Sequence, residues 1–263
     1  MTMSASSSPS FGPLIEDAIR QCVPKSWDEN HITFTWLHAL YSIYGNRELP
    51  WGRGKLLFDC QKLRGDLERK HGDIGMVVKV TGAGGNSFVG FASLEAKRSY
   101  PEYPNDKYHQ LDIGQLQLQT QHAPLHRLLL YSHTALGIAA GQSTHACVLP
   151  AHLGILRAGD SSSLEGAGIS LTNQIRRYFL GWDLDFSPAI VSSVLDGEHR
   201  YSHLLRAHVG LTGDIKLGLQ GVEVERVNYV PLDAPDEDMS LESILPPAPR
   251  PSPRTPSTGG RRL

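Results

Sequence analysis

The sequence has few cysteines, no long apolar run and no excess of positive charge, and each absence excludes a class of protein. Cys22, Cys60 and Cys147 lie far apart without a CxxC pair, which argues against a disulfide scaffold or a zinc knuckle and indicates a reducing, cytoplasmic setting. No apolar run reaches the length of about 18 residues that a transmembrane helix needs, so we expect no membrane association. The net charge of −2 gives no overall positive field of the kind that is typical of nucleic-acid-binding proteins, but a local basic groove is compatible with it.

The two ends of the chain differ in composition from the middle. Residues 1–11 are rich in serine and lack the basic and apolar regions of a signal peptide. Residues 233–263 pass from an acidic stretch, DAPDED, to a proline-rich basic tail. Neither composition buries enough apolar surface to offset the entropy of ordering a chain. We therefore expect disordered termini and one folded domain over residues 12–232.

The apolar pattern within that domain alternates between helical and strand periods. Apolar residues at helical spacing follow Asp28, a good N-cap, and predict a helix up to Tyr44. Two β-rich runs flank the glycine turn TGAGGNS, which predicts a hairpin. The remaining expectations are helices over 53–70, 110–121 and 170–182, and strands over 126–131 and 145–150 and near 188–194 and 222–230. This order predicts an α/β fold with a small mixed β-sheet flanked by helices.

Three charged residues stand where the hairpin strands meet. Asp73 immediately precedes the first strand, and Glu95 and Lys97 end the second. Side chains two apart on a strand share a face, so Glu95 and Lys97 point the same way, and the antiparallel hairpin returns Glu95 to the level of Asp73. Two adjacent carboxylates repel and shift each other's pKa, a cost that a hard divalent cation removes. Lys97 adds a positive charge suited to stabilising a negative transition state.

This arrangement resembles the PD-(D/E)XK nuclease superfamily. Asp73, followed by the run GDIGMVV and then by ASLEAKR with Glu95 and Lys97, is similar to the metal-binding and catalytic strands of Mrr-like members. LDIGQLQLQ resembles the helix that carries a glutamine after the ExK motif, and HRLLLY resembles the next core strand. The resemblance covers residues 28–133 and implies a restriction-endonuclease-like core of αβββαβ type. Gly72 occupies the position before the aspartate, where the family usually has proline.

The resemblance also implies a function and a set of site residues. It implies hydrolysis of phosphodiester bonds with Mg²⁺ or Mn²⁺ held by Asp73 and Glu95, and with Lys97 stabilising the transition state. Glu29, at the start of the first helix, resembles an acidic residue that the family often places near the metal. Gln115 resembles the glutamine that contacts water or nucleic acid.

Each of these residues also has a simpler interpretation. Glu95 and Lys97 match a solvated cross-strand ion pair, and Asp73 matches a turn cap. Glu29 fits the first turn of a helix, where the helix dipole favours a carboxylate. Gln115, with Gln117 and Gln119, fits an ordinary polar helix face.

The function expected from the resemblance is that of a DNA endonuclease of a prokaryotic defence or restriction system, with DNA a better substrate than RNA. A near-neutral charge implies weak intrinsic affinity for DNA, so we expect a protein partner or a homo-oligomer and the role of an effector subunit. The alternative is a catalytically inactive protein of the same fold that binds nucleic acid or a partner. The sequence contains neither a phosphate-binding glycine loop nor HExxH nor G-x-S-x-G.

Overall fold

The computed structural model describes residues 11–45, 48–49, 52–60, 70–82, 87–100, 102–103, 108, 110–135, 142–157, 164–197 and 200–211. The strands are β1 (Glu48–Leu49), β2 (Gly52–Cys60), β3 (Ile74–Thr81), β4 (Ser87–Arg98), β5 (Arg127–Ala135), β6 (Gln142–Pro150), β7 (Ile169–Ser170) and β8 (His203–Leu211). The helices are α1 (Phe11–Gln21), α2 (Glu29–Tyr44), α4 (Ile113–His122), α5 (Ala151–Leu156), α6 (Leu171–Phe179), α7 (Pro188–Leu195) and the 3-10 helix η2 (Glu165–Ala167).

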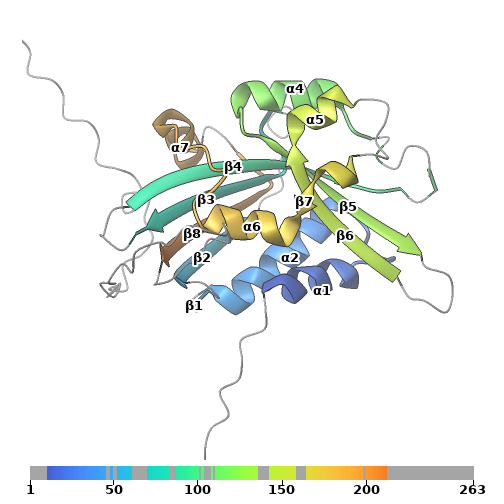
Figure 1. Cartoon of the computed structure of the whole chain (residues 1–263), viewed down its shortest axis with the longest axis horizontal. Coiled ribbons are helices and arrows are strands. Elements are labelled where there is room, and N and C mark those ends of the chain that lie inside the picture. Colours follow the sequence, from blue (N-terminus) through green and yellow to red (C-terminus); the bar gives the residue numbers. More distant parts are fainter. Residues whose placement is uncertain are drawn as a thin grey trace, which may run out of the picture.

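One mixed sheet organises the described residues. Its strand order is β1-β2-β8-β3-β4-β5-β6-β7 (Figure 1). β3 and β4 form the expected antiparallel hairpin, whereas β8 lies parallel to β3 and β5 lies parallel to β4. The last third of the described chain therefore completes the sheet, because it supplies β6, β7 and the inner strand β8.

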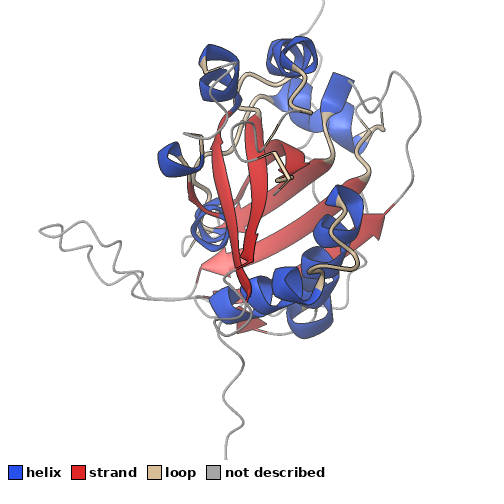
Figure 2. Cartoon of the chain, turned by 90° about the vertical axis from the view of Figure 1, so that its right-hand side faces the viewer, coloured by secondary structure: helices blue, strands red, loops and turns tan. Residues whose placement is uncertain are grey.

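Helices cover both faces of this sheet (Figures 1 and 2). On one face α1, α2 and α6 pack against alternate residues of the strands and form the largest core, which includes the fully buried Trp36. On the other face α7 covers one part of the sheet, and α4 with α5 covers another part over β5 and β6. Alternation along each strand follows from its period of two, so Leu94 and Ala96 of β4 face α2, whereas Glu95 and Lys97 face α4.

The strand β4 changes partner at Leu94. Its antiparallel ladder with β3 ends at the pair Ile74 and Leu94, and its parallel ladder with β5 runs from Leu94 to Arg98. Beyond Leu94 the backbone of β4 therefore has room on the β3 side for a side chain in place of a strand. The charged residues of β4 lie at this point of separation.

Most of the expected elements are present. Asp28 accepts hydrogen bonds from the amides of Asn30 and His31 and caps α2 as the sequence predicts. The hairpin of β3 and β4, the helices α4 and α6 and the strands β5 and β6 also lie where the apolar pattern placed them.

Several expectations were wrong. Residues 52–60 form the strand β2, not the start of a helix, and the sheet is large, not small. The run predicted as a strand near 188–194 is the helix α7, because Pro188 at its first turn favours a helix start and Val191, Val194 and Leu195 form one buried face. Helix α1 begins at Phe11, one residue inside the stretch assigned to the disordered N-terminus. The strand expected near 222–230 and the tail 233–263 lie outside the described residues.

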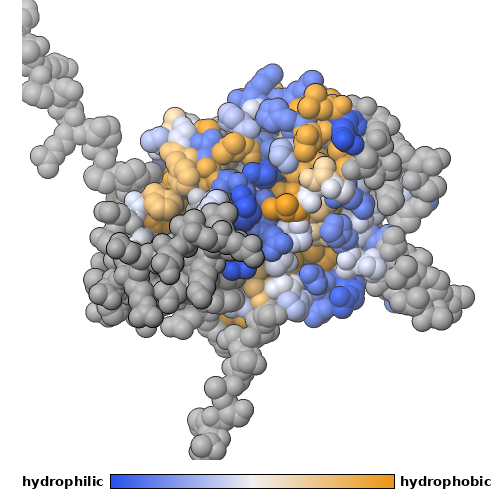
Figure 3. Space-filling view, in the orientation of Figure 1, coloured by the Kyte–Doolittle hydropathy of each residue, from blue (hydrophilic) through white to orange (hydrophobic). Residues whose placement is uncertain are grey.

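In the described part of the chain, no helix is long and apolar enough to cross a membrane. Apolar side chains do reach the surface over α5 and near α7 (Figure 3). Phe88 and Phe186 are examples, and their rings pack edge to face with centroids 5.4 Å apart. Phe88 is the second residue of β4 and Glu95 lies seven residues later, so roughly 23 Å of strand separates this apolar surface from the charged residues.

Candidate active site

The charged residues predicted from the sequence lie together in the structure. Asp73 stands one position before β3, and Glu95 and Lys97 lie on the segment of β4 that has left β3. Glu29 comes from the first turn of α2, and Gln115 comes from α4 on the opposite face of the sheet. Four elements thus contribute to one polar cluster, which contains the residues Glu29, Asp73, Glu95, Lys97, Gln115 and Gln119.

Glu95 is the centre of this cluster. Its side chain is only 2% exposed, and three side chains donate hydrogen bonds to it. Lys97 Nζ lies 2.6 Å and Gln115 Nε2 lies 2.8 Å from Glu95 Oε1, and Gln119 Nε2 lies 2.7 Å from Glu95 Oε2. Asp112 caps α4 by accepting from the amide of Gln115, which fixes the helix that carries both glutamines.

Asp73 extends the ladder between β3 and β4 with its side chain. Its backbone amide donates to Leu94 O at 3.0 Å, and its Oδ2 accepts from the amide of Ala96 at 2.8 Å. The preceding Gly72 has a φ of 92°, and a Cβ atom there would lie 2.8 Å from the ring of His126. Only glycine adopts this conformation readily, so Gly72 is what allows the chain to enter β3 with Asp73 beside β4.

Glu29 reaches the cluster around the end of the sheet. Its Oε1 accepts from the amide of Arg98 at 3.1 Å, and its Oε2 lies 3.7 Å from Lys97 Nζ. Burial raises the pKa of the Glu29 carboxyl, while the nearby Lys97 opposes that rise. Glu29 is therefore held by the backbone of β4 and by Lys97, at the more exposed side of the cluster.

The charges of the cluster do not balance. Burial, followed by repulsion from Asp73, raises the pKa of Glu95 to about 7, although Lys97 and Gln119 lower it. Burial lowers the pKa of Lys97, but attraction by Glu95, Asp73 and Glu29 outweighs this and raises it overall, so Lys97 stays a cation. When the three carboxylates are ionised, one ammonium group leaves an excess of negative charge that a cation would neutralise.

The donor atoms around this excess charge are of the type that hard cations prefer. Asp73 and Glu95 offer carboxylate oxygens, the ligands of Mg²⁺ and Mn²⁺, and Glu29 stands at the rim of the same cluster. The described residues contain no group of three or more His, Cys, Asp or Glu side chains that could hold a metal ion. One further oxygen stands out, because Gln119 Oε1 is buried and has no hydrogen-bond partner among the described residues.

The sequence indicated the aspartate, glutamate and lysine but undervalued Gln119. Gln115 was favoured over Gln119 by its position in the resemblance, yet both donate to Glu95, and Gln119 is the more deeply buried of the two. The two residues lie one helical turn apart, a spacing that places them on the same face of α4. This spacing is the sequence signal that could have identified both.

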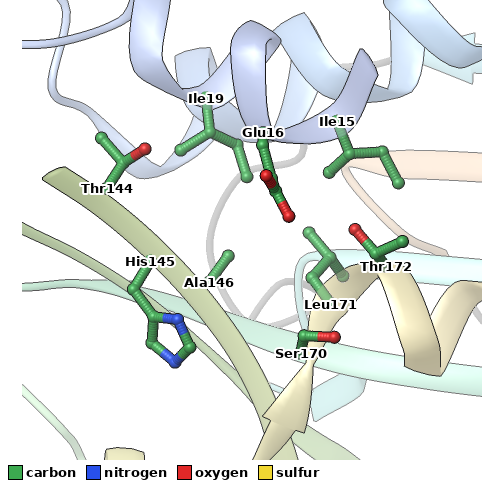
Figure 4. Close-up of a pocket in the computed structure, with 9 residues that line it drawn as sticks. All are labelled: Ile15, Glu16, Ile19, Thr144, His145, Ala146, Ser170, Leu171 and Thr172. Atoms are coloured by element: carbon green, nitrogen blue, oxygen red, sulfur yellow. The ribbon is translucent and has the colours of Figure 1, made fainter. Parts of the chain in front are cut away.

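A separate hollow of about 50 Å³ lies elsewhere, between α1, β6 and the start of α6 (Figure 4). Its lining consists of Ile15, Glu16, Ile19, Thr144, His145, Ala146, Ser170, Leu171 and Thr172. Figure 4 shows the Glu16 carboxylate pointing into it. Helix α1 packs on the face opposite to α4, so this hollow is not part of the polar cluster.

Comparison of the chain with known protein families, with curated protein sequences and with solved structures found no match.

Proposed function

We propose that the chain is a metal-dependent nuclease with a restriction-endonuclease-like core, and that the polar cluster is its active site. The observation that carries this proposal is the convergence of Asp73, Glu95 and Lys97 at the place where β4 separates from β3. Glu29 and Gln115, which the same resemblance pointed to, lie at the same place. Agreement between a sequence pattern and a geometry assembled from four elements supports one site better than either does alone.

The fold around the cluster is compatible with this proposal. Apart from the two-residue strand β1 and the helical residues Lys70 and His71, the described elements α2, β2, β3, β4, α4 and β5 come in an order compatible with an αβββαβ core. The strand that the sequence did not reveal, β2, supplies the first β of that order. Gly72 stands where the family usually has proline, and its positive φ allows the chain to bring Asp73 beside β4. The strand β8 lies between β2 and β3, so the first strand of the proposed core does not pair with the second.

The residues of the cluster have distinct roles in phosphodiester hydrolysis. Asp73 and Glu95 would hold Mg²⁺ or Mn²⁺, which supplies neutralisation of charge on the phosphate when it is bound. Lys97 stays protonated and donates hydrogen bonds to the phosphate oxygens as their negative charge grows. Gln115 and Gln119 hold both oxygens of Glu95 in place, so that the carboxylate has one orientation.

DNA is the proposed substrate class, and a prokaryotic defence or restriction system is the proposed setting, both by resemblance. The net charge of −2 implies that affinity for DNA comes partly from a protein partner or from a second copy of the chain. We propose an effector subunit of this kind.

A second candidate function is an inactive protein of the same fold that binds nucleic acid or a partner. The observation in its favour is that both oxygens of Glu95 already accept hydrogen bonds from side chains of the protein. A purely structural ion-pair network would have this form, and it would bind no divalent cation.

Cleavage of plasmid, single-stranded DNA and RNA in Mg²⁺ or Mn²⁺ tests the proposal. The wild-type protein is compared with Glu95→Gln, with Lys97→Arg and with Glu16→Gln, an exposed carboxylate on α1 that serves as the matched control. We expect the wild type and Glu16→Gln to cleave, and Glu95→Gln and Lys97→Arg to lose activity by about 100-fold or more. Equal cleavage activity in all four proteins contradicts the proposal. So does the absence of cleavage by every one of them when a partner is present.

A further inference from the structure

The amide nitrogen of Gln119 has a hydrogen-bond partner, whereas its amide oxygen has none among the described residues. Its side chain is buried, with 1% of the residue exposed, and Nε2 donates to Glu95 Oε2 at 2.7 Å. Its Oε1 is buried and has no hydrogen-bond partner among the described residues. The reverse orientation of the amide would place Oε1 against a carboxylate oxygen, so the donor side of the amide must face Glu95.

An open acceptor of this kind is costly in a folded protein. Buried polar atoms almost always have a partner, and leaving one without a partner costs about 1–3 kcal/mol. A hydrogen-bond donor from outside the chain, or a cation, would remove that cost. Gln174 Oε1 is open in the same way, so it is the closeness of Gln119 to Glu95 that makes its oxygen a candidate ligand.

The position of Oε1 is restricted by the planar amide. The nitrogen and oxygen of one amide lie about 2.3 Å apart, so Gln119 Oε1 is within roughly 5 Å of Glu95 Oε2. This places it near the Glu95 carboxylate, for which Asp73 is the strongest negative neighbour. An amide oxygen next to the Glu95 carboxylate has the chemistry of a ligand for a hard divalent cation.

We propose that Gln119, through Oε1, is a third oxygen ligand of the divalent cation held by Asp73 and Glu95. This inference rests on the proposed function and extends it by naming a residue of the cation site.

Gln115 provides a matched control on the same helix. It also donates to Glu95, at 2.8 Å through Nε2, but it is only half-buried. A residue that merely orients Glu95 would behave like Gln115. A ligand of the cation would behave differently, because its oxygen matters more than its N–H group.

The test is titration of the full chain with Mn²⁺ by calorimetry, a readout that does not depend on cleavage. The variants are Gln119→Leu, Gln119→Glu, Gln115→Leu and Glu95→Gln, each checked by circular dichroism for a native fold. Both leucine variants remove a donor to Glu95, so we expect the Kd for Mn²⁺ to rise by about 10-fold in Gln115→Leu and by more than that in Gln119→Leu, which also loses the proposed ligand oxygen. Gln119→Glu, which keeps an oxygen and loses the N–H donor, is expected to bind Mn²⁺ at least as tightly as the wild type.

The contrary outcomes separate this inference from the proposed function. If Glu95→Gln loses Mn²⁺ binding while Gln119→Leu keeps it, the site is a cation site and Gln119 is not a ligand. If Gln119→Glu binds as weakly as Gln119→Leu, only the N–H group matters and the inference is wrong. If the wild type binds no Mn²⁺, the proposed function and this inference both fail. If Gln119→Leu does not fold, the Kd of Gln119→Glu for Mn²⁺ is compared with that of the wild type. A weaker affinity of Gln119→Glu than of the wild type then contradicts the inference.

Discussion

Replacing Lys97 with methionine should destabilise the protein in a way that depends on pH. Lys97 Nζ lies 2.6 Å from Glu95 Oε1, with side-chain exposures of 13% and 2%. At an effective dielectric constant of about 20, two unit charges at this distance attract by roughly 6 kcal/mol. Methionine keeps an unbranched stem but removes this attraction, and Gln115 and Gln119 continue to donate to Glu95 and offset part of the loss. We expect the free energy of unfolding to fall by roughly 3 kcal/mol at about pH 8, the low end for breaking a buried ion pair.

The pH dependence follows from the raised pKa of Glu95. That pKa is already about 7 with Lys97 present, above the ordinary value of about 4.3, and it rises further without Lys97. A carboxyl group whose folded pKa is raised costs stability above that pKa, and the cost disappears as the pH falls through it towards the unfolded value. At about pH 5.5 the Glu95 carboxyl is protonated in both proteins, so we expect about 1 kcal/mol of the lost stability to return, since the pKa of Glu95 in the wild type lies one unit below pH 8.

Urea unfolding followed by tryptophan fluorescence and circular dichroism measures both effects. Lys25→Met, at an exposed position, is the matched control and should change the free energy of unfolding by less than about 0.5 kcal/mol. A Lys97→Met protein as stable as the wild type at about pH 8, or one whose loss of stability is the same at about pH 5.5, would contradict this prediction.

Two further predictions concern the frame around the site. Tyr131→Phe removes a hydroxyl that bonds Thr33 at 2.9 Å and accepts from Trp36 at 2.7 Å, joining α2 to β5. It should lower the free energy of unfolding by about 2 kcal/mol in urea, because both partners stay buried, and an unchanged midpoint would contradict this. Asp183, whose pKa is held below its ordinary value by hydrogen bonding to Arg177, contributes stability above about pH 4 that is lost as the pH falls through the lowered pKa. Asp183→Asn should therefore lower the free energy of unfolding by about 1 kcal/mol at neutral pH and leave it unchanged in strong acid. An equal loss of stability at both pH values would count against the ion pair.

The sequence was sufficient to predict those parts of the fold that depend on neighbouring residues. The cap at Asp28, the hairpin of β3 and β4 and the periodicity of α4 are local features, and each is present in the structure. The juxtaposition of Asp73 and Glu95 followed from the hairpin alone, because an antiparallel return brings the two ends of the ladder together. This part of the candidate site needed no knowledge of the remaining chain.

The parts that the sequence did not predict depend on distant contacts. Residues 52–60 form a strand because β8 pairs with them along their length, and β8 comes from residues 203–211. The apolar run of α7 has β-branched residues that favour a strand. It forms a helix because, in that conformation, Val191 and Val194 pack on the sheet. The role of Gln119 likewise depends on the tertiary packing of α4 over Glu95.

The most direct test of the central claim is the Mg²⁺-dependent cleavage of DNA by the wild type and by Asp73→Asn. Asparagine at this position keeps an oxygen that accepts from the amide of Ala96, so the hairpin stays intact while the charge is removed. We expect the wild type to cleave only when Mg²⁺ or Mn²⁺ is added, and we expect Asp73→Asn, natively folded by circular dichroism, not to cleave under the same conditions. Cleavage by Asp73→Asn at the rate of the wild type would contradict it.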